Sequence, residues 1–156
     1  LIRTTYREFE QHPFSFMLTY QAPSLVEEIA EQTDSEQDDV SHVWQFCKDD
    51  GYFRKRGNAW RMTPKAVFRA EELGENVYLD DGIQEDILNS LLQEYRDNPH
   101  RSRVSQDTIL DSFPQRREII MQNLWYLCEK NYVEREGYIG GNAEYEITGL
   151  GRRVIE

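Results

Sequence analysis

The feature that most constrains this chain is an internal repeat, because a chain that repeats itself is built from similar folding units. An apolar-Trp-x-apolar-Cys pattern occurs at residues 43–47 and again at residues 124–128. Each copy is followed by a residue that tolerates a left-handed backbone, Gly51 in the first and Asn131 in the second. Such a residue is typical of the end of a helix, although the register of the two copies differs by one residue.

A second pair of matching segments follows in the same order. Residues 60–66 parallel residues 145–151, and each segment alternates like a strand, closes on Thr and leads into a helix. A chain of 156 residues fits two small domains by the usual range of domain sizes. We therefore predict one domain at residues 1–76 and a second at residues 77–156.

Helical spacing of apolar residues, together with capping and breaking residues, predicts the elements of the second domain. They are a helix at 83–95, a short helix capped by Ser105 that reaches 113, a helix at 115–130, strands at 132–137 and 143–147 joined by the loop 138–142, and a helix from Thr148. Three helices followed by a hairpin is the winged-helix order, in which the hairpin is the wing.

The first domain follows the same plan. We expect a helix at 14–20, a helix at 25–32 capped by Ser24, a helix from Ser35 or Glu36 to Asp50, strands at 52–55 and 59–62, and a helix at 64–74. The boundary between the domains is expected within residues 76–81. The predicted fold class is mainly α with small β-hairpins (α+β), arranged as two tandem winged helix-turn-helix domains.

Residues 127–133 and the segment Tyr145-Glu146-Ile147-Thr148-x-x-Gly151 carry a resemblance to a known family. They are similar to the end of the recognition helix and the wing of archaeal winged-helix transcriptional regulators, including short repressor-like proteins of haloarchaea and their viruses. The resemblance implies sequence-specific binding of double-stranded DNA, with the third helix in the major groove and the wing along the backbone or minor groove.

The charge of the chain limits where DNA could bind. The net charge is -11, and 14 of the 18 basic residues are Arg. An acidic surface poor in Lys resembles the proteins of halophiles, which stay hydrated in concentrated salt, although an ordinary acidic cytosolic protein is the alternative. Because phosphate repels such a surface, any contact with nucleic acid must be local.

By the family resemblance, polar side chains of the third helix in the second domain would meet bases and phosphates, since Arg suits guanine and Gln or Asn suits adenine. These residues are Gln115, Arg116, Arg117, Gln122 and Asn123. Residues near the start of the second helix could hold phosphate, namely Arg101, Arg103, Ser105 and Gln106. The alternative is that they are ordinary solvated charges and polar groups on a helix face.

The first domain departs from this pattern. Its third helix begins with residues 36–39, Glu-Gln-Asp-Asp, and ends with Lys-Asp-Asp at 48–50, so it is a poor reader of a DNA groove. Its wing holds the densest basic cluster of the chain, which we expect to touch the DNA backbone: Arg54, Lys55, Arg56 and Arg61. Alternatively, these charges balance neighbouring acids such as Asp49 and Asp50.

Other classes of function find little support in the sequence. There is no Ser-His-Asp spacing, glycine-rich phosphate loop or set of four metal ligands, so we expect no enzyme, cofactor or metal. Cys47 and Cys128 are expected to be buried thiols. Without an apolar run long enough for a membrane span or a secretion signal, we expect a cytoplasmic protein with no membrane contact.

Two further partner hypotheses stay open. Tandem winged helices also build protein assemblies without DNA, and the net charge favours such a scaffold. In an intermediate case, the second domain reads DNA while the acidic face of the first forms a dimer or recruits another protein. A homodimer is expected for a regulator, because a two-fold protein matches a palindromic site.

Overall fold

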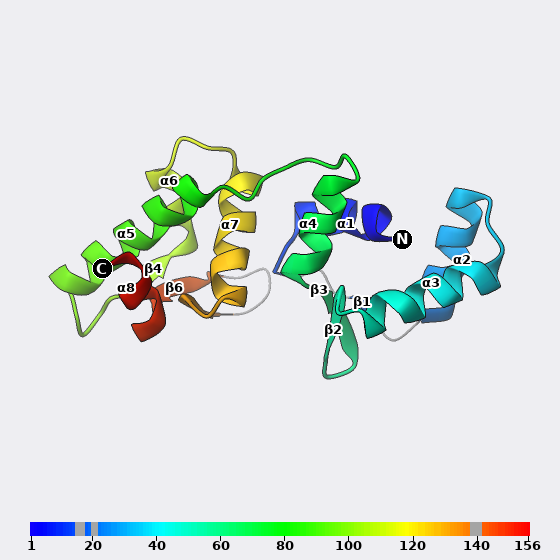
Figure 1. Ribbon diagram of the computed structural model, residues 1–156. Coiled ribbons are helices and arrows are strands. Elements are labelled where there is room, and N and C mark those ends of the chain that lie inside the picture. The colour runs from blue at the N-terminus through cyan, green and yellow to red at the C-terminus, as the bar shows by residue number, and fades with distance from the viewer. Residues whose placement is uncertain (15–17, 20–21, 138–141) are drawn as a thin grey trace. The chain divides into compact units, whose positions relative to one another are not determined.

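The computed structural model describes residues 1–14, 18–19, 22–137 and 142–156 (Figure 1). Within these residues the fold is α+β, with eight helices and two small antiparallel sheets of three strands each. The chain divides into two compact units, of which the first comprises residues 1–12 and 16–77 and the second residues 13–15 and 78–156. A short segment near the N-terminus thus belongs to the second unit, which the sequence did not indicate.

The first unit contains four helices, a short strand and a hairpin among its described residues. In chain order they are α1 (Ile2–Gln11), β1 (Leu18–Thr19), α2 (Ala22–Thr33), α3 (Gln37–Asp49), β2 (Phe53–Arg56), β3 (Ala59–Met62) and α4 (Pro64–Glu72). The strands pair in the order β1-β3-β2. Its core joins Tyr6 and Phe9 of α1 to the buried face of α4, while Trp44 of α3 packs edge-on against Phe53 of β2 with ring centroids 4.9 Å apart.

The second unit repeats this order of elements and strands. It contains α5 (Asp81–Asp97), β4 (Val104–Ser105), α6 (Gln106–Ser112), α7 (Arg117–Glu129), β5 (Val133–Glu136), β6 (Glu144–Ile147) and α8 (Gly149–Ile155), with strand order β4-β6-β5. Its core brings α5, α7 and β6 together through residues such as Ile87, Leu124 and Tyr145, all fully buried. Phe14 packs against this core, with its ring centroid 5.9 Å from that of Tyr145.

The same corner joins helix and hairpin in both units. In the second unit, the Thr148 hydroxyl donates to the Asn131 carbonyl (2.7 Å) and the Thr148 amide donates to the Tyr132 carbonyl (3.0 Å). In the first unit, Thr63 donates to Gly51 (2.7 Å) and to Tyr52 (3.1 Å) in the same way. We call this arrangement the threonine corner. It ties the end of the third helix and the start of one strand to the end of the other strand.

The left-handed residues expected after each third helix are confirmed, since φ is +78° at Gly51 and +58° at Asn131. The structure corrects the alignment of the repeats, however. When Gly51 is placed on Asn131, Trp44 and Cys47 correspond to Leu124 and Leu127, all four of which are buried. The matching Trp and Cys of the two halves are therefore one residue out of structural register, and the true repeat is the pattern of buried positions.

The start of the first unit differs from expectation. No helix spans residues 14–20: Leu18–Thr19 form a strand, and residues 15–17 and 20 lie outside the described part. The first helix is Ile2–Gln11, an element that the sequence pattern did not predict. Ser24 does not precede the second helix, which begins at Ala22. In the second unit, most of the predicted hairpin loop, residues 138–141, is also outside the described residues.

Gly151 offers a direct test of the threonine corner. A Cβ at Gly151 would lie 2.1 Å from the Tyr132 carbonyl oxygen, which is backbone held by the corner, whereas a Cβ at Gly149 would lie 3.6 Å from its nearest neighbour. We predict that Gly151→Ala lowers the free energy of unfolding by about 2 kcal/mol or more, because overpacking forces the backbone apart. The matched variant Gly149→Ala should change it by less than about 1 kcal/mol. Equal urea denaturation curves for the two variants would contradict this prediction.

Candidate nucleic-acid interface

The hairpin of the first unit carries three arginines on one face. Side chains alternate between the two faces of a strand, and the buried residues Phe53 and Met62 mark the face turned to the core. Arg54, Arg56 and Arg61 therefore project from the opposite, outer face. Arg54 is directly across from Arg61 in the pairing of β2 with β3. We call these three arginines the basic face.

Lys55 does not join them. It is paired with Trp60 across the hairpin and falls on the alternate side of the strand from Arg54 and Arg56. The four basic residues that the sequence grouped together are therefore divided into a face of three arginines and a lysine that points the other way. This leaves guanidinium groups, which match phosphate with paired hydrogen bonds, as the main chemistry of the face.

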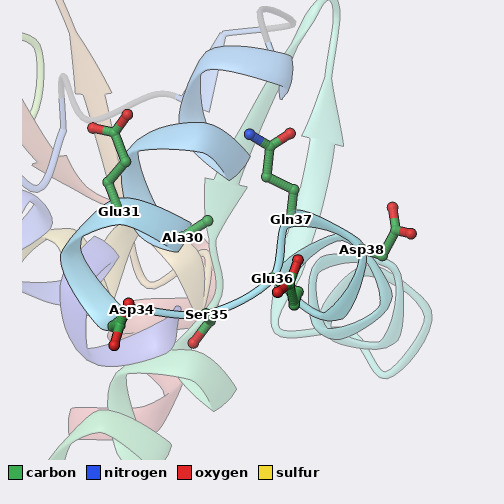
Figure 2. A pocket seen from close by; sticks show the side chains of 7 residues that line it. All are labelled: Ala30, Glu31, Asp34, Ser35, Glu36, Gln37 and Asp38. Atoms are coloured by element: carbon green, nitrogen blue, oxygen red, sulfur yellow. The ribbon is translucent and has the colours of Figure 1, made fainter.

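The turn between α2 and α3 is acidic. A hollow here is lined by Ala30, Glu31, Asp34, Ser35, Glu36, Gln37 and Asp38, as Figure 2 shows. In this view the carboxylates of Glu31, Asp34 and Asp38 point in different directions, so they do not gather around one point. Among the described residues, no group of acids, His or Cys is arranged to hold a metal ion. The start of α3 therefore presents spread negative charge, which repels phosphate.

In the second unit, the structure corrects two of the expected base-reading residues. Gln122 and Asn123 of α7 are fully buried, with 0% of their surface exposed. Asn123 donates to the carbonyls of Tyr78 (2.7 Å) and Ile119 (2.8 Å) and accepts from the Asp80 amide and the Gln84 side chain, both at 3.0 Å. The side chain thus holds the start of the second unit against α7. It is not available to DNA.

The other residues of the second unit that we expected to contact DNA differ in how exposed they are. Arg116 and Arg117 are exposed at the start of α7, and Arg101 is exposed in the segment after α5. Gln115 is half-buried, and its side-chain oxygen has no hydrogen-bond partner among the described residues. Arg116 and Arg117 adjoin each other, whereas Arg101 lies on a separate segment.

Three more of these residues form contacts within the unit. Arg103 pairs with Glu136 and with Glu146 (3.6 Å). Ser105 caps α6 by accepting from the Thr108 amide (3.2 Å). The Gln106 side chain accepts a hydrogen bond from the Tyr145 hydroxyl (3.0 Å). These contacts give each side chain a structural role in the fold.

The hairpin of the second unit carries charge of the opposite sign. Its outer face holds four glutamates, which the sequence analysis missed: Glu134, Glu136, Glu144 and Glu146. Glu134 lies across from Glu146, and Glu136 lies across from Glu144. We call these residues the acidic face. Because carboxylates repel phosphate, this face does not favour the expected position of the second wing on the DNA backbone. The Glu-x-Glu spacing in each strand was a signal that could have revealed it.

Two groups in the second unit, the Cys128 thiol of α7 and the Tyr145 hydroxyl of β6, have raised pKa values. Burial raises the pKa of the Cys128 thiol to about 12 and also raises the pKa of the Tyr145 hydroxyl to about 12. Cys47 and Cys128 are free thiols; Cys47 is buried as expected, but Cys128 is only half-buried. The raised pKa values favour the neutral forms of both groups at ordinary pH, which suits a structural rather than a nucleophilic role.

No helix of the described residues is both long and apolar enough to cross a bilayer. Comparison with known protein families gives no match for the chain, and comparison with curated proteins gives none either. The geometry of the two units therefore carries the functional argument.

Asn123 is expected to be essential for stability rather than for binding. Asn123→Ala removes a donor from the part-buried carbonyls of Tyr78 and Ile119 and removes the acceptor of the buried Gln84 amide. We predict a loss of about 2–4 kcal/mol in the free energy of unfolding, measured by urea denaturation. As a control, Gln93→Ala on the exposed side of α5 should cost less than about 0.5 kcal/mol. If Asn123→Ala were as stable as the parent, the buried network would have no structural importance.

Cys128 is expected to be unreactive in the folded chain. Its pKa of about 12, against an ordinary 9.0, should lower the thiolate fraction at pH 8 by about a thousandfold, since each pKa unit is a factor of ten. Alkylation of Cys128 in a Cys47→Ala background should be slower by about that factor than in denaturant, and it should accelerate as pH rises toward the folded pKa. A rate within about tenfold of the denatured one would contradict the assignment.

Proposed function

We propose that this protein is a non-enzymatic regulator that binds double-stranded DNA, with each unit a winged helix and the basic face in contact with the phosphate backbone. The observation that carries the proposal is the position of Arg54 directly across from Arg61, with Arg56 on the same face. Guanidinium groups set side by side on one strand pair match the oxygens of neighbouring phosphates with paired hydrogen bonds. The wing of a winged helix is also the element that follows the DNA backbone.

The shared order of elements supports the winged-helix assignment. Each unit contains, in order, a helix, a short strand, two helices, a hairpin and a closing helix, and the short first strand pairs with the last strand of the hairpin. This is a helix-turn-helix followed by a wing, in which the third helix is the one that enters the major groove. The third helix is α3 in the first unit, whose acidic start disfavours entry into a groove, and α7 in the second.

In this proposal, fewer residues of the second unit contact DNA than the sequence indicated. With Gln122 and Asn123 buried, contact through α7 falls to its first turn, where Arg116 and Arg117 are exposed and Gln115 is half-buried. Arginine at the start of a recognition helix reaches guanine with paired hydrogen bonds. In this proposal the basic face supplies affinity for the backbone, and the start of α7 supplies preference for sequence.

A protein scaffold is the second candidate, and one observation favours it. Val43 and Phe46 of α3 are 48% and 60% exposed, and acidic residues surround them at both ends of the helix. An exposed apolar pair at the position of a recognition helix suits a protein partner better than a groove in DNA. The two candidates differ in whether the chain binds DNA at all.

DNA binding can be measured with labelled duplexes across a salt series, comparing Arg54→Ala/Arg56→Ala with the parent chain. Each phosphate contact adds about one to the slope of log affinity against log salt, so the double variant should weaken binding at all sequences and lower the slope by about 2. Arg116→Ala/Arg117→Ala should instead lower affinity by about tenfold or more for the preferred duplex and reduce discrimination between duplexes.

The control variant Arg69→Ala/Arg153→Ala removes the same charge from exposed positions on α4 and α8 and should bind like the parent. The proposal fails if the parent chain binds no duplex at about 50 mM salt, where phosphate contacts are strongest. It also fails if Arg54→Ala/Arg56→Ala binds no more weakly than the control. Either result would favour the hypothesis that the protein is a scaffold for protein partners.

A further inference from the structure

The third helix of the first unit carries apolar side chains on a face turned away from the core. Val43 and Phe46 of α3 are 48% and 60% exposed. The residues that α3 buries are Val40, Trp44 and Cys47. Residues three apart on a helix are neighbours on its surface, so Val43 and Phe46 form one exposed apolar stripe. A lone exposed apolar residue is ordinary, but an adjacent pair marks a candidate contact surface.

A hollow of about 210 Å³ opens beside this stripe, between α2 and α3. Its lining includes Ile29, Thr33, Asp39, Val40 and Val43. Ile29 and Val40 are buried members of the small core cluster between these two helices, so the bottom of the hollow is apolar. Val43 belongs both to the lining of the hollow and to the exposed stripe. One apolar side chain of a partner can therefore enter the hollow while its neighbours cover the stripe.

Carboxylates stand at the edge of this surface, near the start of α3. Asp39 lines the hollow, and Figure 2 shows the side chains of Glu36 and Asp38 at the start of the helix. These three carboxylates are exposed and form no ion pair with any other described residue. At the far end of α3, by contrast, Asp50 pairs with Lys65 (3.0 Å). The carboxylates beside the hollow are thus available to basic groups of a partner.

From these observations we infer that α3 binds a basic amphipathic helix of a partner protein. We call the surface formed by Asp39, Val43, Phe46 and the hollow the docking face. An apolar residue of the partner enters the hollow, and further residues of the same apolar stripe cover Val43 and Phe46. Lys or Arg beside that stripe meets the carboxylates at the start of α3. This is the helix-in-groove mode of recognition, in which apolar residues at helical spacing are the anchors.

The inference goes beyond DNA binding and holds whether or not the chain binds DNA. It uses neither the basic face nor the start of α7. It also names the chemistry of a partner for the surface that favours a protein scaffold.

The charge of the docking face favours this partner over two other occupants. A groove of DNA is disfavoured, because the carboxylates at the start of α3 repel phosphate. A second copy is disfavoured, because the chain has a net charge of -11 and its own docking face is acidic. A basic amphipathic helix satisfies the apolar and the charged parts of the surface together. Burial of the apolar stripe then supplies most of the affinity, and the opposite charges supply specificity and faster encounter.

The test begins with a display library of helical peptides, selected on the purified full chain. In every peptide Leu occupies one helical stripe, and each polar position is drawn equally from Lys, Glu, Gln and Ser. Because the docking face is acidic beside its apolar part, the selected peptides should contain Lys far more often than Glu at the positions that flank the Leu stripe.

A selected peptide is then labelled and titrated with each variant by fluorescence anisotropy. Val43→Ser/Phe46→Ser should bind it at least about tenfold more weakly than the parent, because the apolar anchors are lost. Asp38→Asn/Asp39→Asn should weaken binding by about threefold or more at about 50 mM salt. That difference should shrink at about 500 mM salt, where exposed charges are screened.

Matched controls remove the same kinds of side chain elsewhere in the chain. Leu150→Ser/Val154→Ser removes two exposed apolar residues from α8. Asp107→Asn/Asp111→Asn removes two exposed carboxylates from α6, one of them in the first turn. Both controls should bind the peptide like the parent. Circular dichroism of every variant establishes that it is folded.

The inference is overturned if no peptide is enriched, or if the enriched peptides show no excess of Lys. It is also overturned if Val43→Ser/Phe46→Ser binds the selected peptides as tightly as its control does. A dimer of the chain alone that this variant dissociates, measured by sedimentation velocity, would make a second copy the occupant and would overturn the inference as well. Binding of duplexes is measured separately, so a failure to bind DNA would leave these results unchanged.

Discussion

The threonine corner is the interaction on which the rest of each unit depends. Thr63 and Thr148 connect the last strand of a hairpin to the residues that follow the third helix, and they do so with equivalent hydrogen bonds in both units. These bonds set which residue of one strand faces which residue of the other. A shift of one residue would exchange the two faces of a strand, placing Arg54 or Glu134 in the core. The corner therefore determines the charge that each hairpin shows to solvent.

Because the corner fixes the register, the residues on the core face and those on the outer face of a hairpin are under different constraints. The core positions Phe53, Met62, Val133 and Ile147 are apolar in both units, and the outer positions are free to carry either sign. One unit uses this freedom for arginine and the other for glutamate. This explains how a chain of net charge -11 can keep a local surface suited to phosphate. It also means that net charge alone is a poor guide to the partners of this protein.

Much of the fold could be predicted because its signals are local. The Gly and Asn helix ends, the alternating strands and the start of α4 at Pro64 each follow from a few neighbouring residues. The burial of Asn123 could not be predicted from neighbouring residues in this way. Whether a polar residue on a helix is exposed depends on what packs against it, and here that is the backbone at Tyr78 and Asp80, more than forty residues away in sequence.

Of the candidate site, the arginines of the first hairpin were visible in the sequence, but their division into faces was not. Grouping Arg54, Lys55, Arg56 and Arg61 by sequence distance ignored the alternation of the strand, which turns Lys55 away. The glutamates of the second hairpin were missed for a related reason. In a chain this acidic, glutamates on a strand are indistinguishable from ordinary surface residues. Their common face becomes evident only when they are compared with the equivalent positions of the first unit.

The hydrogen bonds on either side of Val77 have a consequence for how the chain connects the two units. The Tyr6 hydroxyl donates to the Asn76 carbonyl (2.7 Å) within the first unit, and Asn123 holds the Tyr78 carbonyl (2.7 Å) within the second. Only Val77 separates these two anchored residues. Residues 13–15 also belong to the second unit, so the chain passes between the units more than once. A residue inserted beside Val77 would therefore lengthen one of these connections and leave the others as they are.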